Sequence, residues 1–172
     1  MPSKNITLKA RYSDDKNNDG IPDKYQAKLT FKVGNPIAGS IKNMWQWQKE
    51  DIVRYVTLTK AGKWATAEEG GKYKIQASDI PEQDASAGFA VQTDPKDRWL
   101  PQADEAEINK DTEFTAQWKQ LLFDLSFDTR GGEPAVIAPI TGVRGVLDKI
   151  FDVLRDKGIN NPTKEGYTFY AW

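Results

Sequence analysis

Alternating apolar and polar residues predict many short β-strands along this chain. The alternation is clearest at residues 5–12, 25–33 and 121–128, where every second side chain is apolar and would lie on one face of a sheet. One helix is predicted at residues 146–157, because apolar side chains follow a helical spacing there and Gly158 stands at the end. The pattern therefore predicts a β-rich α+β fold with one clear helix. Shorter strands are expected at residues 51–59, 73–77, 88–91, 112–118 and 166–172.

One strand pattern occurs twice. Residues 6–12 and 112–118 each place an apolar residue, an alanine and an aromatic residue at alternate positions, and the chain end has a similar form. Each of the first two segments is followed by a linker and a new alternating strand, which favours repeated modules. Coincidence among amphipathic strands is the alternative interpretation. In the alignment Leu8 matches Phe114, Ala10 matches Ala116 and Tyr12 matches Trp118.

Composition and charge exclude several classes of function. The 172 residues are 38% hydrophobic, enough for one ordinary domain or two small ones. A net charge of −1 gives no basic surface for nucleic acid, so no nucleic-acid partner is expected. The chain has no histidine and no cysteine, which excludes Ser-His-Asp and Cys-His catalysis, Cys/His zinc sites and disulfides. No apolar run approaches the roughly 18 residues of a membrane span, and no span is expected.

The polar segment at residues 13–23 has the spacing of a calcium loop. Oxygen-bearing side chains stand at loop positions 1, 3, 5 and 9, and Gly20 stands at position 6, where a sharp turn is needed. An EF-hand would have glutamate at position 12, where this chain has Gln26, so the loop is closer to a dockerin-like half loop. The alternative is a polar linker made of good turn residues. The candidate ligands are Asp15, Asn17, Asp19, the carbonyl of Ile21, and Asp23.

Two of the six tryptophans are candidate ligand-binding residues. Trp45 and Trp47 would share one face of an extended segment, and flat aromatic faces stack on sugar rings. The alternative is that the tryptophans anchor loops or module junctions. Acidic pairs such as Glu68-Glu69 lie in polar, turn-rich sequence and are expected on the solvated surface. No residue stands out as a catalyst, so the prediction is a protein that is not an enzyme.

Residues 119–172 resemble the internalin B-repeat, also called the Listeria–Bacteroides repeat. The matching segments are Leu125–Gly132 and Asn161–Trp172, although Ala171 stands where the family usually has glycine. Residues 13–118 resemble a related Gram-positive surface repeat that follows a thrombospondin type 3-like calcium linker. That similarity rests on Asp19–Gln26 and on short motifs in the family's order, among them Val56–Leu58, Gly62–Trp64 and Thr112–Trp118.

These resemblances imply two consecutive small β-grasp-like modules. Residues 1–12 would hold the closing strand of a preceding module, 13–23 the calcium linker, 24–118 the first module and 119–172 a second, truncated module. The helix would cross a sheet built partly from residues 121–128 and 167–172. The expected strand at residues 4–12 could then complete the second module of another copy by strand exchange.

The function implied is structural. The chain would be a stalk or adhesive spacer within a longer, secreted protein on the bacterial cell surface or cell wall. Its partners would be neighbouring repeat modules, and Ca²⁺ would stiffen the linker between them. The alternative is a module that binds a glycan or a host protein through Trp45 and Trp47.

Overall fold

The computed structural model describes residue 10 and residues 12–145 and 148–172, and it has a β-rich α+β fold, which confirms the predicted class. These residues pack as two compact units. The first contains the described residues up to Lys32, with Glu50–Pro81 and Pro95–Ala116, and the second contains Val33–Lys49, Glu82–Asp94 and Gln117–Trp172. Both units take segments from several parts of the chain, and the module boundaries given above stay predictions. Among the described residues, no helix is long and apolar enough to cross a membrane.

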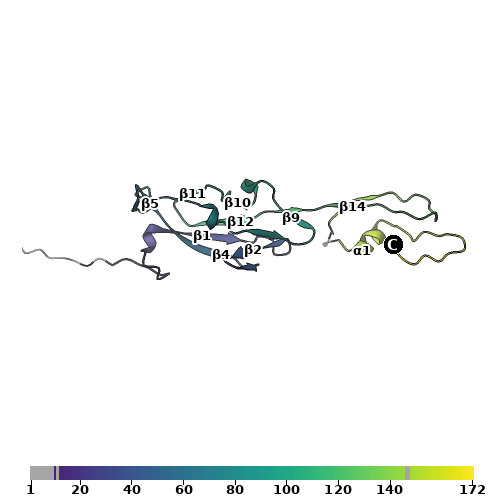
Figure 1. Ribbon diagram of the computed structural model, residues 1–172, viewed down its shortest axis with the longest axis horizontal. Helices are drawn as coiled ribbons and strands as arrows, with labels where there is room; N and C mark the ends of the chain where they lie inside the picture. The colour runs from purple at the N-terminus through teal and green to yellow at the C-terminus, as the bar shows by residue number, and fades with distance from the viewer. Residues whose placement is uncertain (1–9, 11, 146–147) are drawn as a thin grey trace, which may run out of the picture. The chain divides into compact units, whose positions relative to one another are not determined.

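A four-stranded sheet forms the centre of the first unit (Figure 1). Strand β1 (Gln26–Lys32) pairs antiparallel with β4 (Ile52–Thr57) and parallel with β12 (Thr112–Ala116), and β10 (Trp99–Leu100) pairs antiparallel with β12. The β-branched and aromatic residues of these strands suit a pleated surface that is buried on one face.

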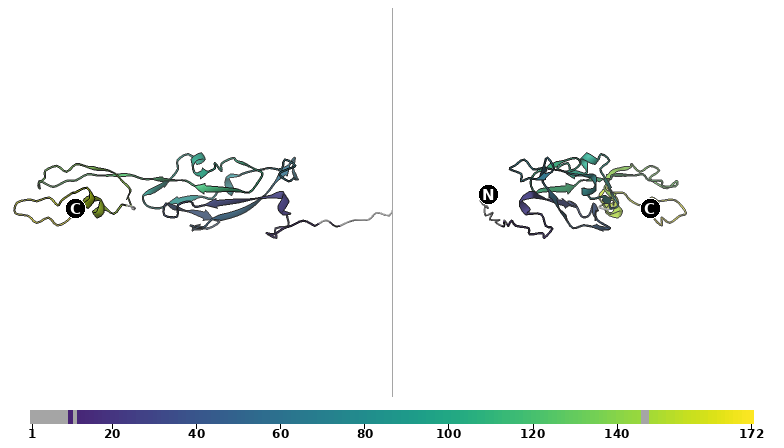
Figure 2. Two further views of the ribbon diagram at one scale, coloured as in Figure 1. Left: turned by 180° about the vertical axis from the view of Figure 1, so that it is seen from behind. Right: turned by 60° about the vertical axis from the view of Figure 1, so that its left-hand side comes forward.

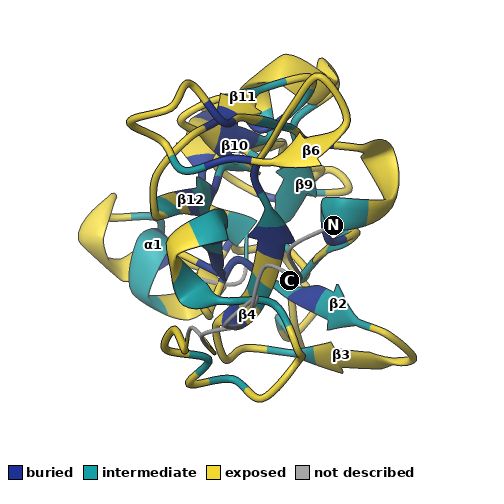
Figure 3. Ribbon diagram, turned by 90° about the vertical axis from the view of Figure 1, so that its left-hand side faces the viewer, coloured by how far each residue is buried: buried dark blue, intermediate teal, exposed yellow. Residues whose placement is uncertain are grey.

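Aromatic rings fill the core of this sheet. Phe31 on β1 is fully buried, and it stacks on Phe114 of β12 with 5.2 Å between ring centroids. The ring of Trp99 from β10 meets Phe31 edge-on at 5.1 Å. The buried residues on these strands appear dark blue in Figure 3. Such offset and edge-on pairs stabilise a core beyond the area that they bury.

Short elements complete the first unit. The hairpin of β5 (Thr59–Lys60) and β6 (Lys63–Trp64) follows β4, and β7 (Tyr73–Lys74) pairs antiparallel with β11 (Glu107–Ile108). The 3-10 helices are η1 (Asp23–Tyr25), η2 (Ala77–Asp79) and η3 (Pro95–Asp97).

The second unit contains several small sheets and the helix. Strand β2 (Gly39–Asn43) lies between β3 (Gln46–Gln48) and β8 (Gln83–Ala85), and β9 (Phe89–Val91) pairs with β13 (Trp118–Gln120). Strand β14 (Phe123–Leu125) pairs antiparallel with β15 (Ile140–Val143), and α1 (Ile150–Asp156) follows. The core beside α1 consists of Ile140, Val143 and Leu154, with Leu125, Phe127, Val153 and Ile159 packed against it.

The second unit departs from the sequence predictions in three respects. The helix is shorter than predicted, beginning at Ile150 and ending at Asp156, and residues 146–147 lie outside the described residues. The strand expected at 166–172 is wrong, because only Tyr167 makes a bridge, to Lys164. The sheet partner of β14 is β15, and not residues 167–172. The chain end packs through its rings instead, since Trp172 meets Phe127 edge-on at 5.1 Å.

A phenol–carboxylate hydrogen bond ties β7 to η2 in the first unit. The Tyr73 hydroxyl donates to Asp79 Oδ2 at 2.6 Å, and the backbone N–H of Gln76 donates to the same oxygen at 2.8 Å. Burial, followed by the hydrogen bond to Asp79, raises the pKa of Tyr73 to about 12. The folded unit therefore holds this phenol in its neutral form.

Replacing Tyr73 with phenylalanine is expected to change how stability depends on pH. The folded pKa lies above the ordinary value of 10.0, so the stabilisation is fully present below about pH 10 and is lost as the pH rises through about 12. Urea unfolding should show a steeper loss of stability across this window for the unaltered chain than for Tyr73→Phe. Tyr55→Phe, which alters a half-exposed ring on β4, should behave like the unaltered chain.

Candidate functional site

The candidate calcium loop is closed by its own carboxylates. Asp15 accepts hydrogen bonds from the backbone N–H groups of Asp19 at 3.2 Å and Gly20 at 2.9 Å, and Asp19 accepts one from Ile21 at 2.8 Å. Gly20 has φ +85°, the left-handed conformation that glycine adopts readily. The hydrogen bond from the backbone N–H of Ile21, followed by the one from the Gln26 side chain, lowers the pKa of Asp19 below its ordinary value. The loop therefore holds an anionic carboxylate at its centre.

The two ends of the loop meet. The backbone N–H of Lys16 donates to Asp23 Oδ1 at 3.1 Å, and the N–H of Asp23 donates to the carbonyl of Asp14 at 2.8 Å. Position 9 is thereby brought back to the start of the loop, as a calcium loop requires. A hollow of about 400 Å³ lies beside this closure, with Asp23 and Asp111 among its lining residues.

Gln26 stands where an EF-hand has glutamate, and its side chain turns into the loop. Its side chain accepts a hydrogen bond from Asn17 Nδ2 at 3.2 Å and donates one to Asp19 Oδ2. The side-chain amide of Gln26, at loop position 12, thus links two candidate ligands, Asn17 and Asp19. The spacing of the sequence already placed Gln26 at this position, but only the fold shows that its side chain turns inward.

The donor set suits a hard cation, although the carboxylates do not converge here. Among the described residues, no three histidine, cysteine, aspartate or glutamate side chains are grouped so that they could hold a metal ion. The loop carboxylates accept backbone N–H bonds, and each retains lone pairs for a further ligand. Oxygen donors of this kind prefer calcium to transition metals. The residues that would hold the ion are Asp15, Asn17, Asp19, Ile21 through its carbonyl, and Asp23.

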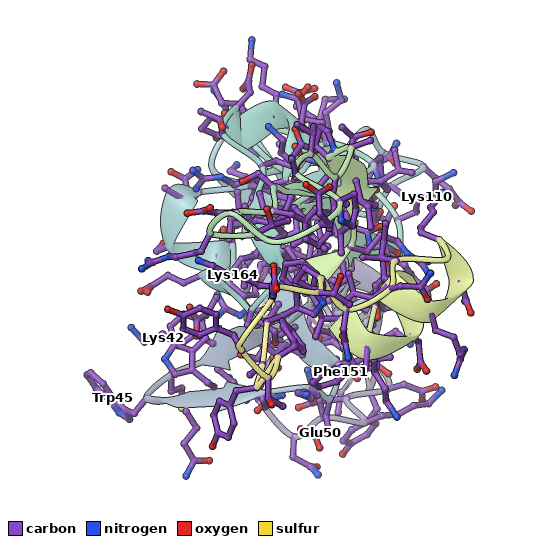
Figure 4. The ribbon with its side chains drawn as sticks, turned by 90° about the vertical axis from the view of Figure 1, so that its right-hand side faces the viewer. Lys42, Trp45, Glu50, Lys110, Phe151 and Lys164 are labelled. Carbon is purple, nitrogen blue, oxygen red and sulfur yellow. The ribbon has the colours of Figure 1, made fainter. Side chains whose placement is uncertain are left out.

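The two candidate tryptophans belong to the β2–β3 hairpin of the second unit. Trp45 lies in the two-residue turn beside Met44, and Trp47 lies in β3 opposite Lys42. The Trp45 side chain is 91% exposed and points away from the ribbon (Figure 4). Met44 is 79% exposed and has φ +55°, which is uncommon for a residue with a long side chain. Two exposed apolar side chains, Met44 and Trp45, therefore stand at the tip of the hairpin. No periodic pattern in the sequence predicted this turn.

Trp47 makes a cation–π contact with Lys42. Lys42 Nζ lies 5.6 Å from the centroid of the Trp47 ring and 3.0 Å from Glu82 Oε1. One face of the Trp47 ring thus carries a cation–π contact, which stabilises exposed pairs modestly. The structure places Trp45 and Trp47 on different parts of the hairpin, the turn and the strand.

Comparison of the chain with protein-family models, curated proteins and solved structures found no match. The resemblance to bacterial surface repeats accordingly stays a prediction.

Most groups with shifted pKa values lie in exposed ion pairs. A hydrogen bond from Lys72 lowers the pKa of Glu107, and hydrogen bonds from Arg144 lower that of Asp148. In the turn at residues 66–69, hydrogen bonds from Thr66 lower the pKa of Glu69. Exposed ion pairs of this kind each contribute little to the stability of the fold.

Proposed function

We propose that this chain is a structural repeat region of a bacterial cell-surface protein, serving as a stalk or adhesive spacer outside the cell, and that it is not an enzyme. Two observations support the proposal. The chain has two units with separate buried clusters, one around Phe31 and one around Leu154. A short sequence motif, leucine–hydroxyl residue–phenylalanine, occurs in both, at Leu29–Phe31 and at Leu125–Phe127.

The repeated motif carries the proposal. In the first unit the motif lies within β1, which pairs antiparallel with β4, and in the second its leucine ends β14, which pairs antiparallel with β15. The repetition of the motif next to an antiparallel strand pair supports a chain built from repeated modules. Calcium would neutralise the carboxylates of residues 15–23 and stiffen the segment that leads into β1.

Calcium is expected to raise the melting temperature of the first unit. Binding to the folded loop alone stabilises by RT ln(1 + [Ca²⁺]/Kd), which is about 1.4–2.7 kcal/mol at 10 to 100 times Kd. Thermal melts with millimolar Ca²⁺, compared with melts in EDTA, measure the shift. Asp19→Asn should abolish it, and Asp104→Asn, on another loop, should preserve it. If Ca²⁺ does not change the melting temperature, the loop does not bind calcium and is a polar linker.

A second candidate function is binding of a glycan or a host protein by the β2–β3 hairpin. The observation in its favour is the 91% exposure of Trp45 beside Met44, which is 79% exposed. Aromatic residues that project in this way supply contact area at low entropic cost. A glycan array separates the two candidates. Tight sugar binding that disappears in a Trp45→Ala, Trp47→Ala double variant favours the binding module, and calcium stabilisation without any glycan ligand favours the spacer.

A further inference from the structure

A hollow lies between two turns and the C-terminal segment of the second unit. It measures about 290 Å³ and is lined by residues of the turn at 128–132, by Pro162–Lys164 and by Tyr167–Trp172. In Figure 1 and in Figure 2 the green segment that follows β14 runs beside the yellow C-terminal segment. Two backbone hydrogen bonds between Glu133 and Thr163, at 2.7 and 2.9 Å, tie these segments together. The hollow is therefore built by the fold itself, as small-molecule sites usually are.

Aromatic rings form one wall of this hollow. The centroid of the Trp172 ring lies 5.4 Å from that of Phe169 and 5.1 Å from that of Phe127, and the rings are steeply inclined in both pairs. Trp172 nevertheless stays 42% exposed, and Tyr167, which lines the same hollow, is 73% exposed. Neighbouring rings thus fix the position of Trp172 while part of its surface remains open. A ring held in this way can pack against the C–H face of a sugar.

Two cationic side chains, Arg130 and Lys164, line the same hollow. Lys164 Nζ donates a hydrogen bond to the backbone carbonyl of Arg130 at 2.9 Å and lies 5.0 Å from the centroid of the Tyr167 ring. Both of these contacts are with neutral groups, so the ammonium charge remains available to an anion. The Arg130 guanidinium lies 3.7 Å from Asp128 Oδ2, and the two side chains are 89% and 81% exposed. An ion pair as loose and exposed as this stabilises little, and a carboxylate of a ligand can take the place of Asp128.

We propose that this hollow binds a sugar ring that carries a carboxylate, as a uronic acid does. The C–H face of the sugar packs on Trp172, and its carboxylate meets Lys164 and Arg130. Rings alone would suit a neutral sugar and cations alone any small anion, so their combination favours the acidic sugar. The volume lies near the lower end of small-molecule sites, which span about 300–1,000 Å³, and suits a single ring. None of the lining residues belongs to the β2–β3 hairpin, so the site is additional to the functions proposed above.

Titration of the full chain with digalacturonic acid tests the proposal, and the neutral disaccharide galactobiose is the comparison. In ¹⁵N-labelled protein the indole N–H signal of Trp172 should shift with a Kd of about 1 mM, as a small exposed site allows. Galactobiose should bind at least about fivefold more weakly. Added salt should raise the Kd for the acid, because salt screens exposed charges. The indole signal of Trp45 should stay unchanged, which separates this site from the hairpin.

Variants assign the site, with binding measured by saturation transfer to the protons of the sugar. Trp172→Ala should weaken binding of the acid at least about tenfold, because it removes the packing surface. Lys164→Gln removes a charge without touching the core, and should weaken binding of the acid about three- to tenfold while leaving galactobiose unaffected. The matched controls should stay within about twofold of the unaltered chain. They are Lys157→Gln, a cation at the end of α1 that does not line the hollow, and Trp64→Ala, a half-exposed ring of the first unit.

Three results overturn the proposal. They are a Trp172 signal that about 20 mM digalacturonic acid does not shift, equal affinity for the neutral disaccharide, and binding of the acid that Lys164→Gln leaves unchanged. None of these results bears on the calcium melts, so failure of this site and failure of the spacer function are distinguishable.

Discussion

Replacing Phe31 with alanine is expected to lower the free energy of unfolding of the first unit by about 3–5 kcal/mol. The side chain is fully buried on β1, and its ring contacts both Phe114 and Trp99. Alanine would remove these contacts and leave a cavity that three strands cannot close without losing their register. The cost therefore includes both the lost burial and the unfilled space.

Chemical denaturation monitored by far-UV circular dichroism measures this loss. Val53→Ala is the matched control, because Val53 lies on the neighbouring strand β4 and its side chain is 50% exposed. That change should alter stability by no more than about 0.5 kcal/mol. A loss of less than about 1 kcal/mol for Phe31→Ala would mean that β1 is not the centre of the core.

Adding one methyl group at Gly39 is expected to cost about 3 kcal/mol in the second unit. A Cβ at this position would lie 2.5 Å from the carbonyl oxygen of Asp84 and 2.5 Å from the ring of Trp118. Neither neighbour can move freely. Asp84 belongs to the paired strand β8, and Trp118 Nε1 donates a hydrogen bond to the carbonyl of Val33 at 2.8 Å. Relief of the clash would break either the pairing or that hydrogen bond.

Gly62→Ala is the comparison for Gly39→Ala. Gly62 has φ +75° in the β5–β6 turn, and a Cβ there would meet nothing within 4 Å. Its substitution should cost about 1 kcal/mol through backbone strain alone. Thermal and urea unfolding of both variants should rank Gly39→Ala as the more destabilised. The reverse order would show that the Trp118 ring has room to shift.

The strands with clear alternation could be predicted from the sequence because burial on one face imposes that alternation. Residues 25–33 and 51–59 fall on β1 and β4, and residues 112–118 contain β12. The polar loop at residues 13–23 could also be anticipated, since its hydrogen bonds join residues that are near in sequence. The strand predicted at residues 5–12 lies outside the described residues, apart from residues 10 and 12.

Contacts between distant residues were beyond prediction from one sequence. The hydrogen bond from Trp118 to Val33 joins residues 85 positions apart, and no local pattern encodes it. Strand β15 was missed because Gly142, at φ +74°, interrupts its alternation. Residues 166–172 alternate like a strand, yet Trp172 packs on Phe127 and on Phe169, and only Tyr167 makes a bridge, to Lys164. Trp45 is exposed because it lies in the turn between β2 and β3, and the turn propensities of these residues did not predict that turn.

The parallel arrangement of β1 and β12 has a mechanical consequence. The chain enters the central sheet at Gln26, the start of β1, and leaves it at Ala116, the end of β12. Because the two strands run in the same direction side by side, a pull on these two points drags the strands lengthwise past each other. The hydrogen bonds between them are then loaded together, not opened one at a time from an end. Resistance to tension is thus built into the order in which this unit's strands are connected.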